Sequence, residues 1–212
     1  MKVRDDITQF ISTINPNLTV VAATKYVNSD QMRILYQNGI TNFGENRTDK
    51  FLKKYEELND LENITWHFIG HLQRNKAKDV INKIDYLHSL DSLELAKIID
   101  KYRTKPLNTF IEVSINLEEN KNGVPVDKTE DFLNEVLKYK NIEIVGFMMM
   151  AYKEGNDHRE EFNKLKILRD KLEIKFNKKF PYLSMGMSND YKQAIECGAT
   201  HIRIGSILFT ND

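Results

Sequence analysis

Lys25 follows a run of apolar and small residues, Thr19–Thr24, that has the composition of a buried strand. If Lys25 turns toward a strand-lined interior, period-two alternation puts Val21 and Ala23 on the same side and leaves room for a ligand. An amine held there is partly removed from water, which favours its neutral form and lets it attack a carbonyl carbon. Lys25 is therefore a candidate for covalent attachment of a carbonyl compound. The alternative is a lysine at the rim whose ammonium lies in water.

A second group of residues could bind an anion near the end of the chain. The segment from Ser184 to Asp190 follows an apolar strand candidate and enters a helical pattern, in which Ser188 is a natural N-cap. Gly205 and Ser206 follow the next strand candidate, where glycine permits close backbone approach to an anion. We expect a phosphate site here, and the alternative is an ordinary cap and turn.

Arg203 lies two residues before Gly205 and shares its face of the strand. An arginine between two isoleucines is costly to bury without a partner. That partner is either a carboxylate, such as Glu112 or Glu45, or an atom of a ligand.

The stretch from Trp66 to Val80 alternates aromatic and aliphatic residues up to Gly70 and then becomes basic and amide-rich. This pattern is typical of a strand that passes into a helix. It places His67 and His71 at the carboxyl end of a strand, where parallel α/β proteins carry their chemistry. We do not expect these two histidines to bind a metal together, because they do not share one helix.

The elements that must position these residues alternate along the whole chain. Eight apolar runs predict strands, at 19–24, 41–44, 64–69, 86–90, 109–115, 142–149, 182–185 and 201–204. Amphipathic stretches between them predict helices, at 30–38, 48–58, 72–81, 93–102, 130–139, 158–176 and 190–196. Gly39 and Gly198 are predicted helix stops.

Strict strand–helix alternation with eight strands predicts an α/β protein with a single closed (β/α)8 barrel over residues 1–212. A doubly wound sheet would need a glycine-rich turn after its first strand, and Ala23-Thr24-Lys25-Tyr26 stands there. Too few residues follow Gly205 for a full eighth helix. We expect an extra N-terminal helix to cover that gap, with Val3, Ile7, Phe10, Ile11 and Ile14 at helical spacing.

Several short motifs closely resemble those of the pyridoxal 5′-phosphate (PLP) homeostasis protein family, whose members are related to the N-terminal barrel of alanine racemase. The motifs are Ala23–Tyr26, Phe43–Asn46, Trp66–Lys76, Lys121–Gly123, Gly146–Met148, Leu183–Ser188 and Ile202–Ser206. They cover nearly the whole chain in the order of the family. The resemblance implies an alanine racemase-like barrel that binds PLP.

The resemblance also implies roles for single residues. Lys25 would form a Schiff base with PLP, and Arg203 would donate to the pyridine nitrogen, as in alanine racemase. Because a guanidinium stays protonated, the ring nitrogen would stay largely unprotonated and the cofactor would be a poor electron sink. Asn46 and Met148 match family residues near the cofactor. Lys121 also matches a family lysine, and we expect it to be solvated.

These observations predict a PLP-binding protein of vitamin B6 and amino-acid homeostasis that has little or no catalytic activity. The alternative is a PLP-dependent amino-acid racemase, which needs a base on each face of the cofactor. Alanine racemases bring their second base from an extra domain of a partner subunit, which we do not expect here, and Tyr26 should point away from Lys25. A third possibility is a Schiff-base aldolase, although no acid is obviously placed beside Lys25.

Composition limits the partners and the compartment. The 31 basic residues balance the 31 acidic ones, so we expect neither nucleic acid nor an anionic membrane as a partner. Cys197 is the single cysteine, which excludes an internal disulfide. We expect no signal segment, because no apolar stretch follows the charged residues 2–6, and no apolar run of spanning length occurs in the sequence. We expect a cytoplasmic monomer whose possible protein partners are PLP-dependent apoenzymes.

Overall fold

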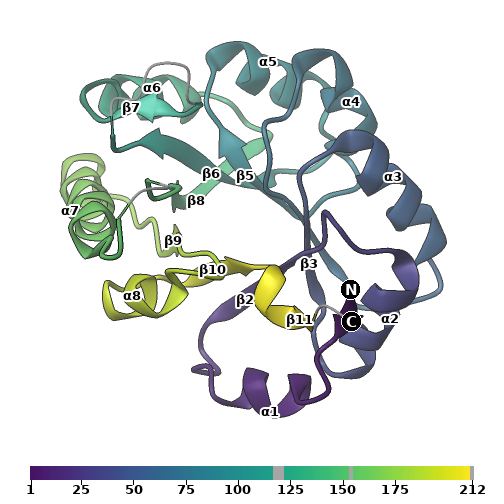
Figure 1. Ribbon diagram of the computed structural model, residues 1–212. Helices are drawn as coiled ribbons and strands as arrows, with labels where there is room; N and C mark the ends of the chain where they lie inside the picture. The colour runs from purple at the N-terminus through teal and green to yellow at the C-terminus, as the bar shows by residue number, and fades with distance from the viewer. Residues whose placement is uncertain (117–121, 153–154, 211–212) are drawn as a thin grey trace.

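The computed structural model describes residues 1–116, 122–152 and 155–210 (Figure 1). Within these residues, eight parallel strands form a ring and helices surround it. The barrel strands are β2 (Thr19–Ala23), β3 (Asn42–Glu45), β4 (Thr65–Phe68), β5 (Tyr86–Leu90), β6 (Leu107–Ser114), β8 (Ile142–Met148), β9 (Tyr182–Ser184) and β10 (His201–Ile204). Pairing of β5 with β6 and of β10 with β2 closes the ring. The predicted (β/α)8 barrel is confirmed.

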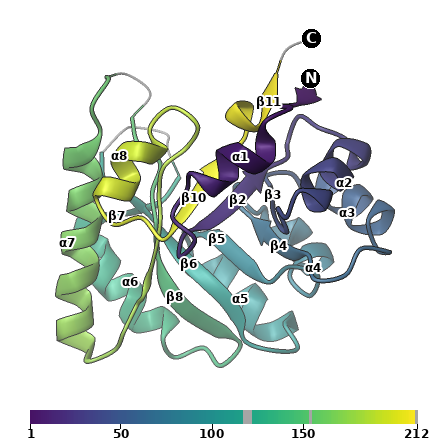
Figure 2. The ribbon, with the colours of Figure 1, turned by 90° about the horizontal axis from the view of Figure 1, so that it is seen from below.

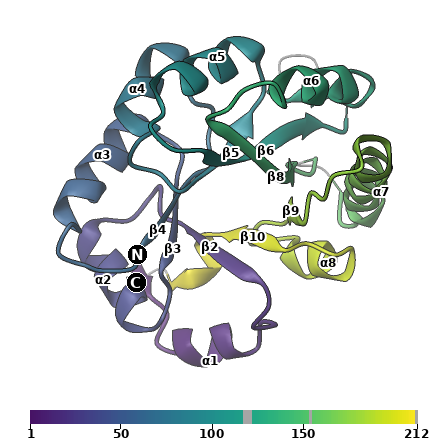
Figure 3. The ribbon, with the colours of Figure 1, turned by 180° about the vertical axis from the view of Figure 1, so that it is seen from behind.

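The helices cover the outside of the barrel in chain order (Figures 1 and 3). They are α1 (Ile7–Ser12), α2 (Ser29–Gln37), α3 (Thr48–Glu57), α4 (Ala77–Val80), α5 (Leu93–Tyr102), α6 (Thr129–Val136), α7 (Arg159–Phe176) and α8 (Tyr191–Glu196), with short 3-10 turns η1 (Arg74–Lys76), η2 (Val126–Lys128) and η3 (Ser206–Leu208). Asn28 and Gln31 form a capping box at the start of α2, and Ser92 caps α5. Gly39 and Gly198 adopt positive φ angles after α2 and α8, in agreement with the predicted stops.

The N-terminal helix lies in the ring between α8 and α2 (Figures 1 and 2), which is the place of an eighth barrel helix. Ile7 and Ile14 are buried, and the ring of Phe10 packs edge-on against Tyr191 of α8 at 6.4 Å between centroids. Val3 was predicted to belong to this helix, and that prediction is wrong. It lies in β1 (Lys2–Val3), whose backbone pairs antiparallel with β11 (Phe209–Thr210).

One other segment is more irregular than its sequence pattern predicts, and one short strand was not predicted. The helix expected over residues 72–81 is reduced to η1 and the four-residue α4. The unpredicted strand is β7 (Val124–Pro125), which pairs with β6, and Lys121 lies outside the described residues.

Aromatic and imidazole rings fill the barrel toward the amino ends of its strands. They belong to His67, Tyr86, His88, Phe110, Tyr182 and His201, and neighbouring ring centroids are 4.4–6.4 Å apart. His201 is two residues before Arg203 on β10, so the filled part of the barrel ends just before Arg203. The carboxyl ends of the strands are left for a ligand site.

Candidate functional site

A cavity of about 650 Å³ lies at the carboxyl ends of β2, β8, β9 and β10. Five of the residues predicted from the sequence contribute to its wall: Lys25, Ser188, Arg203, Gly205 and Ser206. They come from the two ends of the chain and meet because β10 pairs with β2. The lining also includes Tyr26, Tyr152 and Met187, which give the cavity an apolar side. Its size and mixed lining are typical of a small-molecule site.

Lys25 follows β2 in a turn, and its side chain is exposed at this cavity. The partial desolvation predicted for Lys25 is therefore wrong, because the residue lies beyond the last paired residue of β2, Ala23. The predicted direction of Tyr26 is also wrong: both residues line the cavity, and Lys25 Nζ lies 4.8 Å from the centroid of the Tyr26 ring. Strand alternation does not continue through a turn, so the two neighbours share one side.

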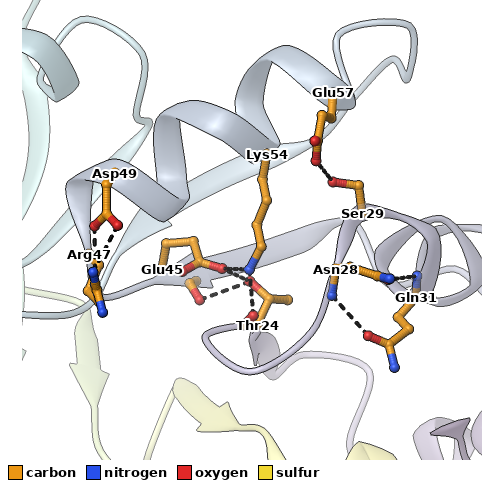
Figure 4. A network of polar contacts seen from close by, with 10 residues as sticks. Thr24, Asn28, Ser29, Gln31, Glu45, Arg47, Asp49, Lys54 and Glu57 are labelled. Carbon is orange, nitrogen blue, oxygen red and sulfur yellow. Dashed lines mark hydrogen bonds and ion pairs between the residues drawn. The ribbon is translucent and has the colours of Figure 1, made fainter. Parts of the chain in front are cut away.

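The residue before Lys25 is held by a buried ion pair (Figure 4). Lys54 of α3 donates from Nζ to the carbonyl oxygen of Thr24 at 2.6 Å and lies 2.5 Å from Oε1 of Glu45. The Thr24 hydroxyl donates to the same carboxylate oxygen at 2.5 Å. These contacts fix the backbone from which Lys25 projects. Glu45 was considered a partner of Arg203, and the structure pairs it with Lys54 instead.

Sequence reasoning missed Lys54, although a signal was present. Phe51, Lys54 and Leu58 follow one another at spacings of three and four, so Phe51 and Lys54 share one face of α3 with Leu58, the residue that caps its end. Phe51 and Leu58 are buried in the core, and Lys54 is only 5% exposed. A lysine at a buried position of such a face requires a partner.

Asn46 follows β3 and does not line the cavity. It lies against Gly70, where a Cβ atom would come within 2.5–2.7 Å of Asn46 atoms, so this contact requires glycine. The side-chain oxygen of Asn46 is buried and has no hydrogen-bond partner within the described part of the chain. The role of Asn46 toward a cofactor stays a prediction.

The loops after β9 and β10 are joined by hydrogen bonds. The amide of Gly205 donates to Oγ of Ser188 at 3.1 Å, and the amide of Arg203 donates to the carbonyl oxygen of Gly186 at 2.9 Å. Gly205 packs closely on β2, because a Cβ atom would lie 3.0 Å from the carbonyl oxygen of Ala23. These contacts hold the two loops against each other and against β2, and we call Ser188, Gly205 and Ser206, which line the cavity here, the cradle.

The predicted cap of α8 is wrong in its detail. Asp190 is the N-cap residue of α8, and its carboxylate accepts a hydrogen bond from the amide of Met187 at 2.5 Å. Ser188 lies in the turn before it, where its half-buried hydroxyl faces the cavity instead of the helix. The exposed Ser206 belongs to the same cavity lining.

Arg203 reaches the cavity from within the barrel and is only 4% exposed. Its Nη1 donates to Oγ of Ser184 at 2.6 Å, and its Nη2 donates to the carbonyl oxygen of Met149 at 2.8 Å. Burial lowers the pKa of Arg203 to about 10, against the opposing attraction of Glu112 and Asp190. Arg203 is therefore still a cation at neutral pH, and its remaining N–H groups are available to a ligand.

Glu112, the other carboxylate considered for Arg203, acts on it through space. Burial raises the pKa of Glu112 to about 7, and the charge of Asp91 adds to this rise while Arg203 opposes it. Met148 is fully buried on β8 and is not part of the cavity lining. Its role toward a cofactor stays a prediction.

His67 lies inside the barrel and reaches the cavity only through other residues. Its Nδ1 lies 2.9 Å from Nε2 of His88, and Nδ1 of His88 lies 2.8 Å from Oγ of Ser184. Burial lowers the pKa values of both histidines well below the ordinary value. His71 lies on the outside, 3.1 Å from Asp91, so His67 and His71 face different partners.

Comparison with known proteins agrees with this fold. Residues 15–211 match the family described as alanine racemase, N-terminal domain. Alanine racemase from Clostridium difficile shares the fold with a TM-score of 0.80 at 13% identity, and the alignment covers all of this chain and 58% of the racemase. The fold and the family match thus define a barrel of the alanine racemase type.

Relatives that match this chain over most of their own length show to which family it belongs. The pyridoxal phosphate homeostasis protein of Aquifex aeolicus is 42% identical over 90% of this chain and 85% of its own, and that of Synechocystis is 36% identical over 95% and 94%. PipY of Synechococcus elongatus, whose structure is known without and with PLP bound, is 28% identical, and the PLP-free structure gives a TM-score of 0.93 over 99% of this chain and all of PipY. The chain belongs to the pyridoxal phosphate homeostasis protein family.

Proposed function

We propose that this protein binds PLP in the cavity between β2 and β10 and serves the homeostasis of vitamin B6 and amino acids. The observation that carries the proposal is the convergence of three groups on one cavity: the amine of Lys25, the cradle of Ser188, Gly205 and Ser206, and the guanidinium of Arg203. PLP has an aldehyde, a phosphate and a pyridine nitrogen, one for each of these groups. The PLP-bound structure of PipY and the names of the relatives support the same ligand.

Each group has a distinct role in the proposal. The Lys25 amine would condense with the aldehyde of PLP, whose oxygen would leave as water, and the backbone of Thr24, held by Glu45 and Lys54, sets the point from which Lys25 projects. Ser188, Ser206 and the amide of Ser206 donate hydrogen bonds to the phosphate. When PLP is bound, it supplies an electron-withdrawing ring, and Arg203 limits this property because a permanent cation does not protonate the ring nitrogen.

This arrangement favours binding of the cofactor over catalysis with it. Racemisation needs a base on each face of the substrate and usually a closed site. Lys25 provides one amine, and the cavity leaves it exposed. Tyr26 shares the cavity and is 75% exposed, so its hydroxyl is the group to test for the alternative racemase function.

The same proposal includes the location, the oligomeric state and the protein partners. We place it in the cytoplasm as a single domain over residues 1–212 that acts as a monomer, with PLP-dependent apoenzymes as the proteins that could receive the cofactor. Among the described helices, none has the length and apolar character needed to cross a membrane. The single cysteine, Cys197, is buried and unpaired, which suits a reducing compartment.

Titration with PLP, followed by absorbance near the visible edge, tests the proposal. The wild-type protein should bind one PLP per chain, and borohydride should fix it on the tryptic peptide that contains Lys25. The Lys25→Ala variant should not be labelled, whereas Lys50→Ala, on the exposed side of α3, should behave like the wild type. A label on another lysine, with Lys25 unmodified, would overturn the assignment.

A further inference from the structure

A chain of hydrogen bonds runs from the cavity through the barrel interior. Arg203 donates to Oγ of Ser184, which contacts Nδ1 of His88 at 2.8 Å. Nε2 of His88 contacts Nδ1 of His67 at 2.9 Å, and Nε2 of His67 contacts Oδ1 of Asn42 at 3.0 Å. The five residues come from five different strands or strand ends, and the two histidines and Ser184 are fully buried.

The two ends of this chain determine the direction of every bond in it. Arg203 can only donate, so Ser184 Oγ accepts from it. Asn42 Oδ1 can only accept, so the proton of His67 is on Nε2. A neutral imidazole carries one N–H, which leaves Nδ1 of His67 to accept from Nε2–H of His88.

The same argument gives the direction of the hydrogen bond between His88 and Ser184. Nδ1 of His88 has no proton, so it accepts from the hydroxyl of Ser184. Each hydrogen bond then points from Arg203 toward Asn42, and no donor faces another donor. The lowered pKa values of His67 and His88 agree with neutral rings.

Both imidazoles are held by stacking as well as by hydrogen bonds. The His67 ring stacks on Tyr86 with 4.8 Å between centroids and 9° between planes. The His88 ring stacks on Phe110 with 4.4 Å between centroids and 28° between planes. The position and orientation of the acceptor that faces Ser184 are therefore fixed by the packed core.

We propose that His88 and His67 are positioning residues that orient the Ser184 hydroxyl and thereby aim the Arg203 guanidinium at the ring nitrogen of the ligand. The inference rests on the proposed function, because it concerns the ligand atom that Arg203 faces. Because Nδ1 of His88 accepts a hydrogen bond from the Ser184 hydroxyl, the lone pairs of Ser184 stay turned toward Arg203. Without that acceptor, the hydroxyl can rotate and compete with the guanidinium for the same direction.

The test compares two ligands, PLP and its analogue in which a carbon–hydrogen group replaces the ring nitrogen. The wild-type protein should bind PLP about ten- to a hundredfold more tightly than the analogue, which is the effect of one hydrogen bond from a charged donor. In His88→Phe this preference should fall by roughly three- to tenfold. His88→Asn should keep most of it, because the asparagine oxygen can accept near the position of Nδ1.

His201→Phe is the matched control. His201 is buried in the same group of rings, and its Nδ1 contacts Thr200 outside the chain of hydrogen bonds. A packing defect would lower the affinity for both ligands equally in either variant. The proposal instead requires that the preference for PLP over the analogue falls in His88→Phe alone. An unchanged preference in His88→Phe overturns the inference. If the wild-type protein binds neither ligand, the proposed function fails instead.

A second measurement uses the unaltered protein. Nitrogen chemical shifts of the imidazole rings should show both His67 and His88 neutral, with the proton of each on Nε2. A proton on Nδ1 of either ring would break the single direction of the chain and overturn the proposal. This readout does not depend on ligand binding or on the folding of a variant.

Discussion

Nζ of Lys54 lies 2.5 Å from Oε1 of Glu45, and the two side chains are only 6% and 0% exposed. The second carboxylate oxygen of Glu45 has no hydrogen-bond partner within the described residues, so the polar contacts of this carboxylate there are those of Oε1 with Lys54 and with the Thr24 hydroxyl. Because both side chains bond Thr24, the ion pair links the outer helix α3 to the residue before Lys25 (Figure 4). Its removal should affect the stability of the fold and the geometry of the cavity.

Replacement of Lys54 by methionine should lower the free energy of unfolding by about 3 to 5 kcal/mol, because it leaves a buried carboxylate unpaired. Urea denaturation measures this loss. Lys53→Met is the matched control: Lys53 is 70% exposed and lies 3.6 Å from Glu57, so its loss should cost about 0 to 1 kcal/mol. Equal losses in the two variants would show that the ion pair does not contribute more than a surface pair.

Replacement of Ser188 by alanine should weaken PLP binding by about ten- to a hundredfold, which corresponds to roughly 1.5 to 3 kcal/mol for one charge-assisted hydrogen bond. Binding of pyridoxal, which lacks the phosphate, should change much less. Ser12→Ala, on α1 and outside the cavity lining, is the control and should bind both compounds like the wild type. If Ser188→Ala loses affinity for both compounds equally, Ser188 does not bind the phosphate.

The free energy of unfolding should fall as the pH drops from about 6.5 toward 4. Burial lowers the pKa of His201 to about 4, and it lowers those of His67 and His88 as well. The unfolded chain therefore binds more protons than the folded one in this range, at up to about 1.4 kcal/mol per pH unit for each histidine. Urea midpoints measured across this range report the slope.

Glu112 opposes the histidines in part of that range. Its pKa is raised from 4.5 to about 7, so the folded state binds the extra proton between these values and gains stability as the pH falls. Three histidines against one carboxyl group still give a net loss. Glu112→Gln removes the opposing contribution and should make the fall steeper. A flat profile between pH 6.5 and 4.5 would contradict the assignment of neutral buried histidines.

The purified protein should exchange the α-proton of alanine in deuterated water hardly faster than free PLP does. In the proposed function the ring nitrogen stays unprotonated and no second base acts, and both conditions slow removal of the α-proton. A base alone contributes about 10² to 10⁴ in rate. Both enantiomers should be measured, with Tyr26→Phe as the variant that tests the hydroxyl beside Lys25. A kcat of about 1 to 10³ per second that is lost in Tyr26→Phe would make the protein a racemase.

The fold could be predicted from the sequence because each barrel strand is a short apolar run between helical stretches. Strands 86–90 and 201–204 have the predicted bounds, and the other six differ only at their ends. Helix 72–81 was predicted too long because its periodicity does not show where a 3-10 turn replaces α-helical geometry. Val3 was assigned to a helix because the pairing of residues far apart in the chain leaves no local pattern.

The candidate site was predictable where chemistry is tied to chain position. Lys25, Arg203 and Gly205 lie at strand ends, and a parallel barrel brings such residues to one face. The partners of these residues were not predictable in the same way. Lys54 reaches Thr24 from another helix, and His88 reaches Ser184 across the barrel, so neither contact follows from local spacing.

The cavity lies where the first barrel strand meets the last one. Lys25 follows β2, whereas Arg203 lies on β10 and Gly205 and Ser206 follow it, and the pairing of β2 with β10 joins them. A chain under synthesis displays Lys25 early, but it has no site for the ligand until β10 has emerged from the ribosome. Ligand binding as proposed is therefore a property of the completed barrel, and a prematurely terminated product would expose Lys25 without the other residues that line the cavity.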